Sequence, residues 1–194
     1  ELRIIDGCIV CSNDDQDYVA KRKWCKNTYI IRNSVDVNRY SKIRDFSQDV
    51  LNRKTLLFCG DLAYGANVQG LKWFLDGVWP KMQKKDSSLR LQIVGRNPHE
   101  SISRYADGES VILFPNVPDV VPYYNNVSIV IVPLHVAGGT RIKILESFAA
   151  RRPVVSTRIG AEGLDLVSGK HFLQADDPES FADACLRLFN NFEL

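Results

Sequence analysis

The sequence contains very little methionine: Met82 is the only one among 194 residues. The chain therefore carries no initiator methionine, and we expect it to be a piece of a longer protein. Long hydrophobic runs are also missing, since no stretch approaches the roughly 18 apolar residues of a membrane-spanning helix, and no signal peptide is visible. A formal net charge of +2 argues against a general nucleic-acid binder, so no nucleic-acid partner is expected.

Motifs for metal and hydrolytic chemistry are equally scarce. No group of His, Cys, Asp and Glu has the spacing of a metal site, so no metal is predicted, and neither a GxSxG motif nor a GxxxxGK[ST] P-loop occurs. The five cysteines are an odd number with irregular spacing. Cys8 and Cys11 form a CxxC, but no second pair follows and the surrounding run GCIVCS is apolar. This pattern favours buried, reduced thiols over zinc or redox chemistry.

From residue 55 onward, apolar runs typical of strands alternate with helical segments. Strands are expected at 55–60, 89–95, 111–115, 128–134, 153–157 and near 171–175. Helices are expected at 67–85, 99–106, 119–126, from residue 140, and at 178–191. The alternation predicts an α/β fold with right-handed crossovers, a Rossmann-like doubly wound parallel sheet covered by helices on both faces.

The first 47 residues are less regular. A strand is expected at 3–11, a short polar helix at 14–24 and another strand at 28–32. A polar stretch over 33–53 lacks clean periodicity, and we interpret residues 33 to about 47 as a linker or domain edge. The predicted domains are therefore 1–47 and 48–194.

In open parallel sheets, ligands bind beyond the carboxyl ends of the strands. The loops that follow the predicted strands are the candidate binding segments: 60–67, 95–99, 115–119, 134–141 and 157–163. Four of these five loops contain glycine, which permits a close approach of the backbone to a ligand. Gly60 and Gly160 are the candidates in the first and last of these loops.

The most informative loop precedes the helix expected from residue 140. Gly138 and Gly139 can expose backbone N–H groups, and Thr140 can cap the helix or bind a phosphate oxygen. Arg141 and Lys143 add two cations in the first helical turn, where the helix dipole already attracts anions. The segment predicts a phosphate or diphosphate site.

Other side chains at this sheet edge have weaker signals. Glu146 can accept hydrogen bonds from two sugar hydroxyls, although an ordinary i, i+3 pair with Lys143 explains both residues as well. Arg96 follows a strand that ends in glycine and suits a phosphate or base contact. Asn116 is expected to turn the chain, with the backbone of Val117 beside a base edge. Asn67 is expected to be a helix N-cap first and a ligand contact second.

Several motifs in order resemble one family. The run PLHVAGGTRIKILESFAARRPVVSTRIGAEGL is similar to the donor-binding domain of GT-B glycosyltransferases of the group 1, family 4 type. The resemblance covers residues 56–191 and includes the segments FCGDLAYGANVQGLKWFLDGVWP, LQIVGRNP, FPNVPDVVPYY and QADDPESFADAC. Residues 1–47 are similar to the end of the N-terminal acceptor domain and the interdomain link, and 48–194 to the nucleotide-sugar-binding domain.

The resemblance implies a nucleoside-diphosphate sugar of the UDP or GDP type as donor substrate, with no separate cofactor. It implies that Arg141 and Lys143 hold the diphosphate, that Glu146 binds the ribose, that Asn116 and Val117 border the base, and that residues 160–163 line the interdomain cleft. The reaction is expected to be retaining and metal-independent. The acceptor, a glycan, lipid or other hydroxyl compound, is expected on an N-terminal domain outside this chain, together with the base.

The resemblance also implies a cytoplasmic enzyme, and it leaves open whether the full-length protein associates with the inner membrane face. One departure concerns Gly138, which stands where many members have a glutamate that contacts the donor sugar; a subgroup with GGTR-type loops is more similar. Two alternatives stay open at this point: a nucleotide-binding module without catalysis, and a GT-B-like epimerase or hydrolase of nucleotide sugars. The chain alone is expected to bind nucleotide and to transfer little or no sugar.

Overall fold

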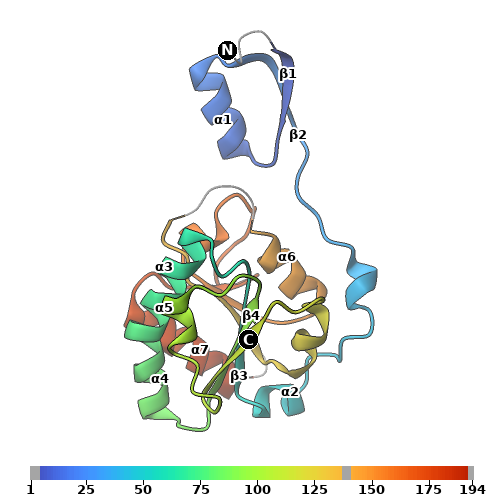
Figure 1. Cartoon of the computed structure of the whole chain (residues 1–194). Helices are drawn as coiled ribbons and strands as arrows, with labels where there is room; N and C mark the ends of the chain where they lie inside the picture. The colour runs from blue at the N-terminus through green and yellow to red at the C-terminus, as the bar shows by residue number, and fades with distance from the viewer. Residues whose placement is uncertain (1–4, 137–140, 192–194) are drawn as a thin grey trace.

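The computed structural model describes residues 5–136 and 141–191, which form a small and a large unit (Figure 1). The small unit contains β1 (Ile5–Val10), α1 (Asn13–Arg22) and β2 (Cys25–Ile30), and its two strands are parallel. This order confirms a strand, a short helix and a second strand in this part of the sequence.

An extended connector leads from β2 to the large unit (Figure 1). Within the predicted linker a 3-10 helix, η2 (Val37–Tyr40), forms just before α2 (Gln48–Asn52). Tyr40 and Ile43 are buried against the large unit, where Tyr40 contacts the ring of Tyr124 edge to face. Part of the predicted linker is therefore packed structure that fixes the connector to the large unit.

The large unit is built on one sheet of six parallel strands. They are β3 (Thr55–Cys59), β4 (Arg90–Gly95), β5 (Val111–Pro115), β6 (Ile129–Val132), β7 (Val154–Ser156) and β8 (Leu173–Gln174). The strand order is β5-β4-β3-β6-β7-β8, and every pair in it is parallel. This is the predicted doubly wound sheet, and its order reverses between β3 and β6.

Helices cover both faces of this sheet (Figure 1). At least one helical element follows each strand of this sheet. In chain order the described elements are α3 (Gly65–Trp73), the π-helical η3 (Phe74–Val78), α4 (Trp79–Lys85), α5 (Glu100–Ser103), η4 (Val121–Asn126), α6 (Ile142–Ala149), η5 (Ile159–Ala161) and α7 (Pro178–Asn190). All five residues of β3 are buried, because alternate side chains enter two cores. Leu56 and Phe58 pack with α3, α4 and α7, whereas Leu57 and Cys59 pack with η2, η4 and α6.

Three expectations require correction. The helix expected at 67–85 begins at Gly65, and it contains a π turn before Pro80 enters α4. Asn67 does not cap it, because its side-chain amide donates to the backbone carbonyl of Asp61 from within the helix. No disulfide joins any of the five cysteines, all of which lie in the described ranges, but Cys8 and Cys11 are only partly buried, because both faces of the small sheet are partly open. The buried thiols are those of Cys59 and Cys185.

Candidate functional site

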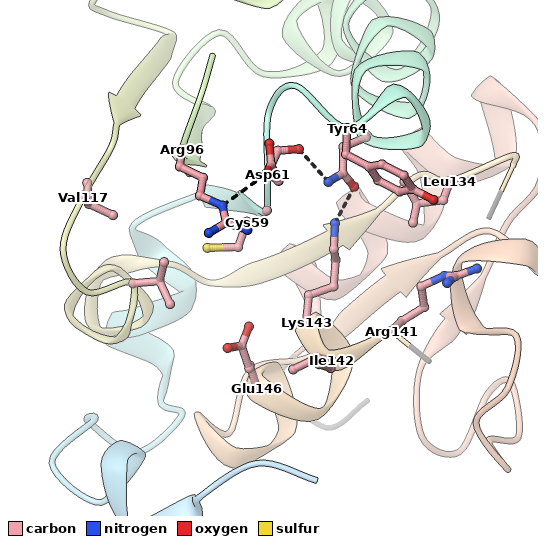
Figure 2. Close-up of a pocket in the computed structure, with 14 residues that line it drawn as sticks. Cys59, Asp61, Tyr64, Arg96, Val117, Leu134, Arg141, Ile142, Lys143 and Glu146 are labelled. Atoms are coloured by element: carbon pink, nitrogen blue, oxygen red, sulfur yellow. Dashed lines mark hydrogen bonds and ion pairs between the residues drawn. The ribbon is translucent and has the colours of Figure 1, made fainter. Parts of the chain in front are cut away.

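A pocket of about 550 Å³ opens at the carboxyl edge of the large sheet, where the strand order reverses. Neighbouring crossovers leave in opposite directions at such a point and open a crevice between their loops. Loops that follow four neighbouring strands, β3 to β6, line it together with the start of α6 (Figure 2). The lining residues are Cys59, Gly60, Asp61, Tyr64, Asn67, Gly95, Arg96, Val117, Val120, Leu134, Arg141, Ile142, Lys143 and Glu146.

The first turn of α6 brings two cations to this pocket. The helix begins at Ile142, with Arg141 at the N-cap position (φ −84°, ψ 82°), so the expected start at residue 140 was too early. Arg141 is only 7% exposed, and burial is the main reason that its pKa is lowered. Figure 2 shows Arg141 at one end of the pocket and Lys143 nearer its centre. The positive end of the helix dipole lies behind both, which favours an anion.

Lys143 is partly buried, and its ammonium is enclosed by protein groups. Its Nζ donates to Asn67 Oδ1 at 2.9 Å, a bond drawn as the dashed line at Lys143 in Figure 2. The same Nζ lies 4.2 Å from the centroid of the Phe58 ring. Burial lowers the pKa of Lys143 to about 8, because desolvation disfavours the charged form. The described hydrogen bond of the Lys143 ammonium is thus to a side chain of another helix, α3, and not the i, i+3 pair with Glu146 that was the alternative explanation.

Glu146 lies one turn further along α6 and points into the pocket (Figure 2). Next to it, burial raises the pKa of Cys59 to about 12, with a further contribution from the charge of Glu146. Burial likewise raises the pKa of Tyr40 well above its usual range, with Glu146 as the second cause. Around this carboxylate, the thiol and the phenol thus stay protonated at neutral pH.

Arg96 faces the pocket from the loop that follows β4. Its Nε donates to Asp61 Oδ2 at 3.1 Å, and this ion pair crosses between the loops after β3 and β4 (Figure 2). The pKa of Asp61 is lowered chiefly by the backbone N–H of Ala63, and Arg96 adds to this effect. Because the side chain of Arg96 is 74% exposed, it can move to a ligand at small cost.

The structure brings together six of the predicted site residues: Gly60, Arg96, Val117, Arg141, Lys143 and Glu146. Asn116 does not line the pocket. It turns the chain at φ 53°, and its Oδ1 accepts the backbone N–H of Asn97 at 2.8 Å. Gly160 is also outside it, buried in η5, with its N–H bonded to Thr157 Oγ1 at 2.9 Å. The predicted contacts of Gly138, Gly139 and Thr140 lie outside the described residues.

Sequence reasoning missed Asp61 and gave Asn67 the wrong primary role. Asp61 directly follows Gly60 at the end of a strand, which was an available signal for a site residue. Tyr64 and Leu134 lie in the candidate loops 60–67 and 134–141, but their residue types gave no sign of a ligand contact, and Cys59 belongs to the buried strand itself.

Within 5–136 and 141–191, no three His, Cys, Asp or Glu side chains are grouped so as to hold a metal ion. None of the helices in these ranges is both long enough and apolar enough to cross a bilayer.

A family model described as "Glycosyl transferases group 1" matches residues 53–191. Among curated proteins, the chain is similar to an "Uncharacterized 44.6 kDa protein in cps region" of Klebsiella pneumoniae, with 26% identity over 195 residues. The match covers 96% of this chain and 48% of that protein, so the chain spans about half the length of its curated relative.

Solved structures show the same fold at low identity. The crystal structure of TarM matches with a TM-score of 0.76 and 17% identity, over 96% of this chain and 37% of that one. The structure of Anabaena Alr3699/HepE in complex with UDP and glucose matches with a TM-score of 0.75 and 13% identity, over 98% of this chain and 55% of that one.

Proposed function

The chain belongs to the group 1 glycosyl transferases, and from that premise we propose that it binds the nucleoside diphosphate of a UDP- or GDP-sugar in the pocket beside α6. The observation that carries the proposal is the convergence of three cations, Arg96, Arg141 and Lys143, on one pocket at the sheet's switch point. The HepE structure contains UDP and glucose, which supports this ligand class.

The chemistry would be displacement of the diphosphate from the anomeric carbon. An acceptor hydroxyl attacks this carbon, the bond to the diphosphate oxygen breaks, and negative charge develops on the departing group. Arg141 and Lys143 would stabilise that charge, with the α6 dipole behind them. No metal would be required, since these cations supply the positive charge. Glu146 would accept the ribose hydroxyls, and the loop at Val117 would border the base.

Gly138, Gly139 and Thr140 complete this proposal from outside the described residues, and they would offer backbone N–H groups to the phosphates. Their sequence is the basis for placing the chain in a GGTR-type subgroup. Asn116 would act through the turn that presents Val117, and Gly160 through its loop at the cleft. Retention of anomeric configuration is part of the same proposal.

The acceptor would bind another domain of a longer protein. The match to only 48% of the Klebsiella relative's length supports this division. We propose that residues 1–47 belong to the end of that acceptor domain and the link, and 48–194 to the donor domain. The acceptor would be a glycan, lipid or other hydroxyl compound, and the enzyme would work in the cytoplasm, associated with the inner membrane face. This chain alone would then bind nucleotide without efficient transfer.

The test is calorimetric titration of the chain with UDP, GDP and their glucose and mannose conjugates. Arg141→Ala removes one charge-assisted contact and is expected to lower the affinity for the preferred ligand by about 10- to 100-fold. Arg90→Ala is the matched control, because Arg90 lies at the opposite, amino end of β4 and its side chain donates to the backbone carbonyls of Ser87 and Leu89, away from the pocket. Equal affinity in all three proteins, or no binding by any of them, would refute the proposal.

Product analysis separates the reaction classes. Steady turnover of a nucleotide sugar to its epimer or to free sugar, without acceptor, would favour an epimerase or hydrolase over a transferase. A non-catalytic module would give a different result in the full-length protein. The wild type would bind nucleotide without any measurable reaction, and Arg141→Ala would change binding alone.

A further inference from the structure

Asn67 links the loop after β3 to the ammonium of Lys143. It lies in the first turn of α3 and is only 6% exposed. Its Nδ2 donates to the backbone carbonyl of Asp61 at 2.8 Å, and its Oδ1 accepts from Lys143 Nζ at 2.9 Å. Since only the nitrogen can donate to Asp61, the first bond fixes the orientation of the amide and turns its oxygen to Lys143.

The other groups around the Lys143 ammonium do not hold it in one position. The face of the Phe58 ring attracts a cation without a preferred direction. The charged and titratable groups that face it are Cys59 from β3 and Arg141 and Glu146 from α6, and Arg141 repels it. Among these described groups, Asn67 therefore supplies the directional contact.

We propose that Asn67 is a positioning residue, which holds the Lys143 ammonium charged and aimed at the site of the donor diphosphate. This inference rests on the proposed function. A neutral amide suits this role, because it fixes and stabilises the ammonium without cancelling its charge. A carboxylate at the same place would hold the ammonium too, but it would repel the diphosphate.

The space around Gly60 is a second, independent observation. A Cβ at this position would come within 2.9 Å of Asn67 Nδ2 and 3.2 Å of Lys143 Nζ. A side chain here would displace the amide and the ammonium together. Gly60 thus leaves room for this pair in the wall of the pocket.

The experiment measures the pKa of Lys143 and nucleotide affinity in the same variants of the full chain. Lysines labelled with ¹³C at Cε are titrated by NMR, and the Lys143 signal is assigned from its loss in Lys143→Met. UDP and GDP are titrated calorimetrically at pH 7.5. The variants are Asn67→Ala, Asn67→Asp and, as a control, Gln83→Ala, because the amide of Gln83 makes a similar bond to a backbone carbonyl, that of Leu89, at 2.9 Å.

Asn67→Ala is expected to lower the pKa of Lys143 by about 1 and to weaken binding about tenfold. Asn67→Asp is expected to raise this pKa and still weaken binding, whereas Gln83→Ala changes neither. Opposite pKa changes with the same loss of affinity distinguish positioning from a general structural defect. Asn67→Asp, which keeps the size of the side chain, carries the test alone if Asn67→Ala does not fold.

An unchanged Lys143 pKa in the folded variants would overturn the role of Asn67, even if nucleotide affinity fell. If the pKa changes as expected but the wild type binds neither UDP nor GDP, the proposed function fails and the diphosphate role of Asn67 fails with it. The two failures are therefore distinguishable.

Discussion

Replacing Lys143 by methionine is expected to stabilise the unliganded protein while removing most of its nucleotide affinity. Methionine has nearly the same length, and its thioether suits the Phe58 ring face that the ammonium now occupies, but it carries no charge. The buried ammonium attracts an anionic ligand, but it destabilises the unliganded protein, because burial disfavours its charged form. Removing it should therefore separate stability from binding.

The size of the effect follows from the pKa of Lys143, which falls from 10.5 to about 8. At neutral pH this depression corresponds to roughly 3 kcal/mol of unfolding free energy, at about 1.4 kcal/mol per pKa unit. Loss of the hydrogen bond to Asn67 offsets about 1–2 kcal/mol of this gain. The net stabilisation is about 1–2 kcal/mol, or a rise in Tm of several degrees for a chain of this size.

The pH dependence of unfolding shows whether the buried Lys143 ammonium destabilises the folded protein. Below pH 8 the folded and unfolded states both bind the proton, so the wild type carries the full cost of the buried charge. Between about pH 8 and 10.5 the unfolded state still binds the proton and the folded state does not. The stability of the wild type therefore rises with pH in this window relative to Lys143→Met. Thermal melts by circular dichroism at pH 7, 8.5 and 10, with Lys84→Met on the exposed surface of α4 as control, measure the difference.

A lower Tm for Lys143→Met at pH 7, together with undiminished binding of UDP or GDP, would refute the reasoning. A stability difference independent of pH would contradict the pKa on which the magnitude rests.

Two glycines give the remaining predictions. Gly95→Ala places a Cβ 1.8 Å from the carbonyl oxygen of Gly60. The substitution should therefore lower the free energy of unfolding by more than about 3 kcal/mol and also deform the pocket. Urea unfolding measures the first effect and UDP titration the second. Gly160→Ala places a Cβ 2.4 Å from Val132 O and Ser156 Oγ, away from the pocket lining. It should lower the free energy of unfolding by about 1–3 kcal/mol in the same assay, yet leave the UDP affinity of the folded protein within twofold. A larger loss of affinity would argue for the predicted donor contact at this position.

The sheet was predictable because its strands are buried on both faces and appear as continuous apolar runs. The strand expected at 111–115 agrees with β5 at both ends, and the helix expected at 178–191 agrees with α7 to within one residue. The π turn over Phe74–Val78 has no comparable pattern, since a single wide turn leaves the spacing of apolar residues almost unchanged.

The cations of the site were predictable from their place after a strand, but their partners were not. Lys143 and Glu146 are neighbours along one helix, so local spacing favours their pairing. Asn67 is 76 residues away along the chain, and only the parallel packing of β3 against β6 brings it to Lys143. The start of α6 was placed too early for a related reason: Thr140 is a good capping residue by type, whereas in the described part of the chain the N-cap position is that of Arg141.

A crystal structure of the chain grown with millimolar UDP or GDP tests the central claim most directly. The account predicts a diphosphate within hydrogen-bonding distance of both Arg141 and Lys143, at the start of α6. A nucleotide bound elsewhere, or a pocket that stays empty at saturating concentration, would contradict it.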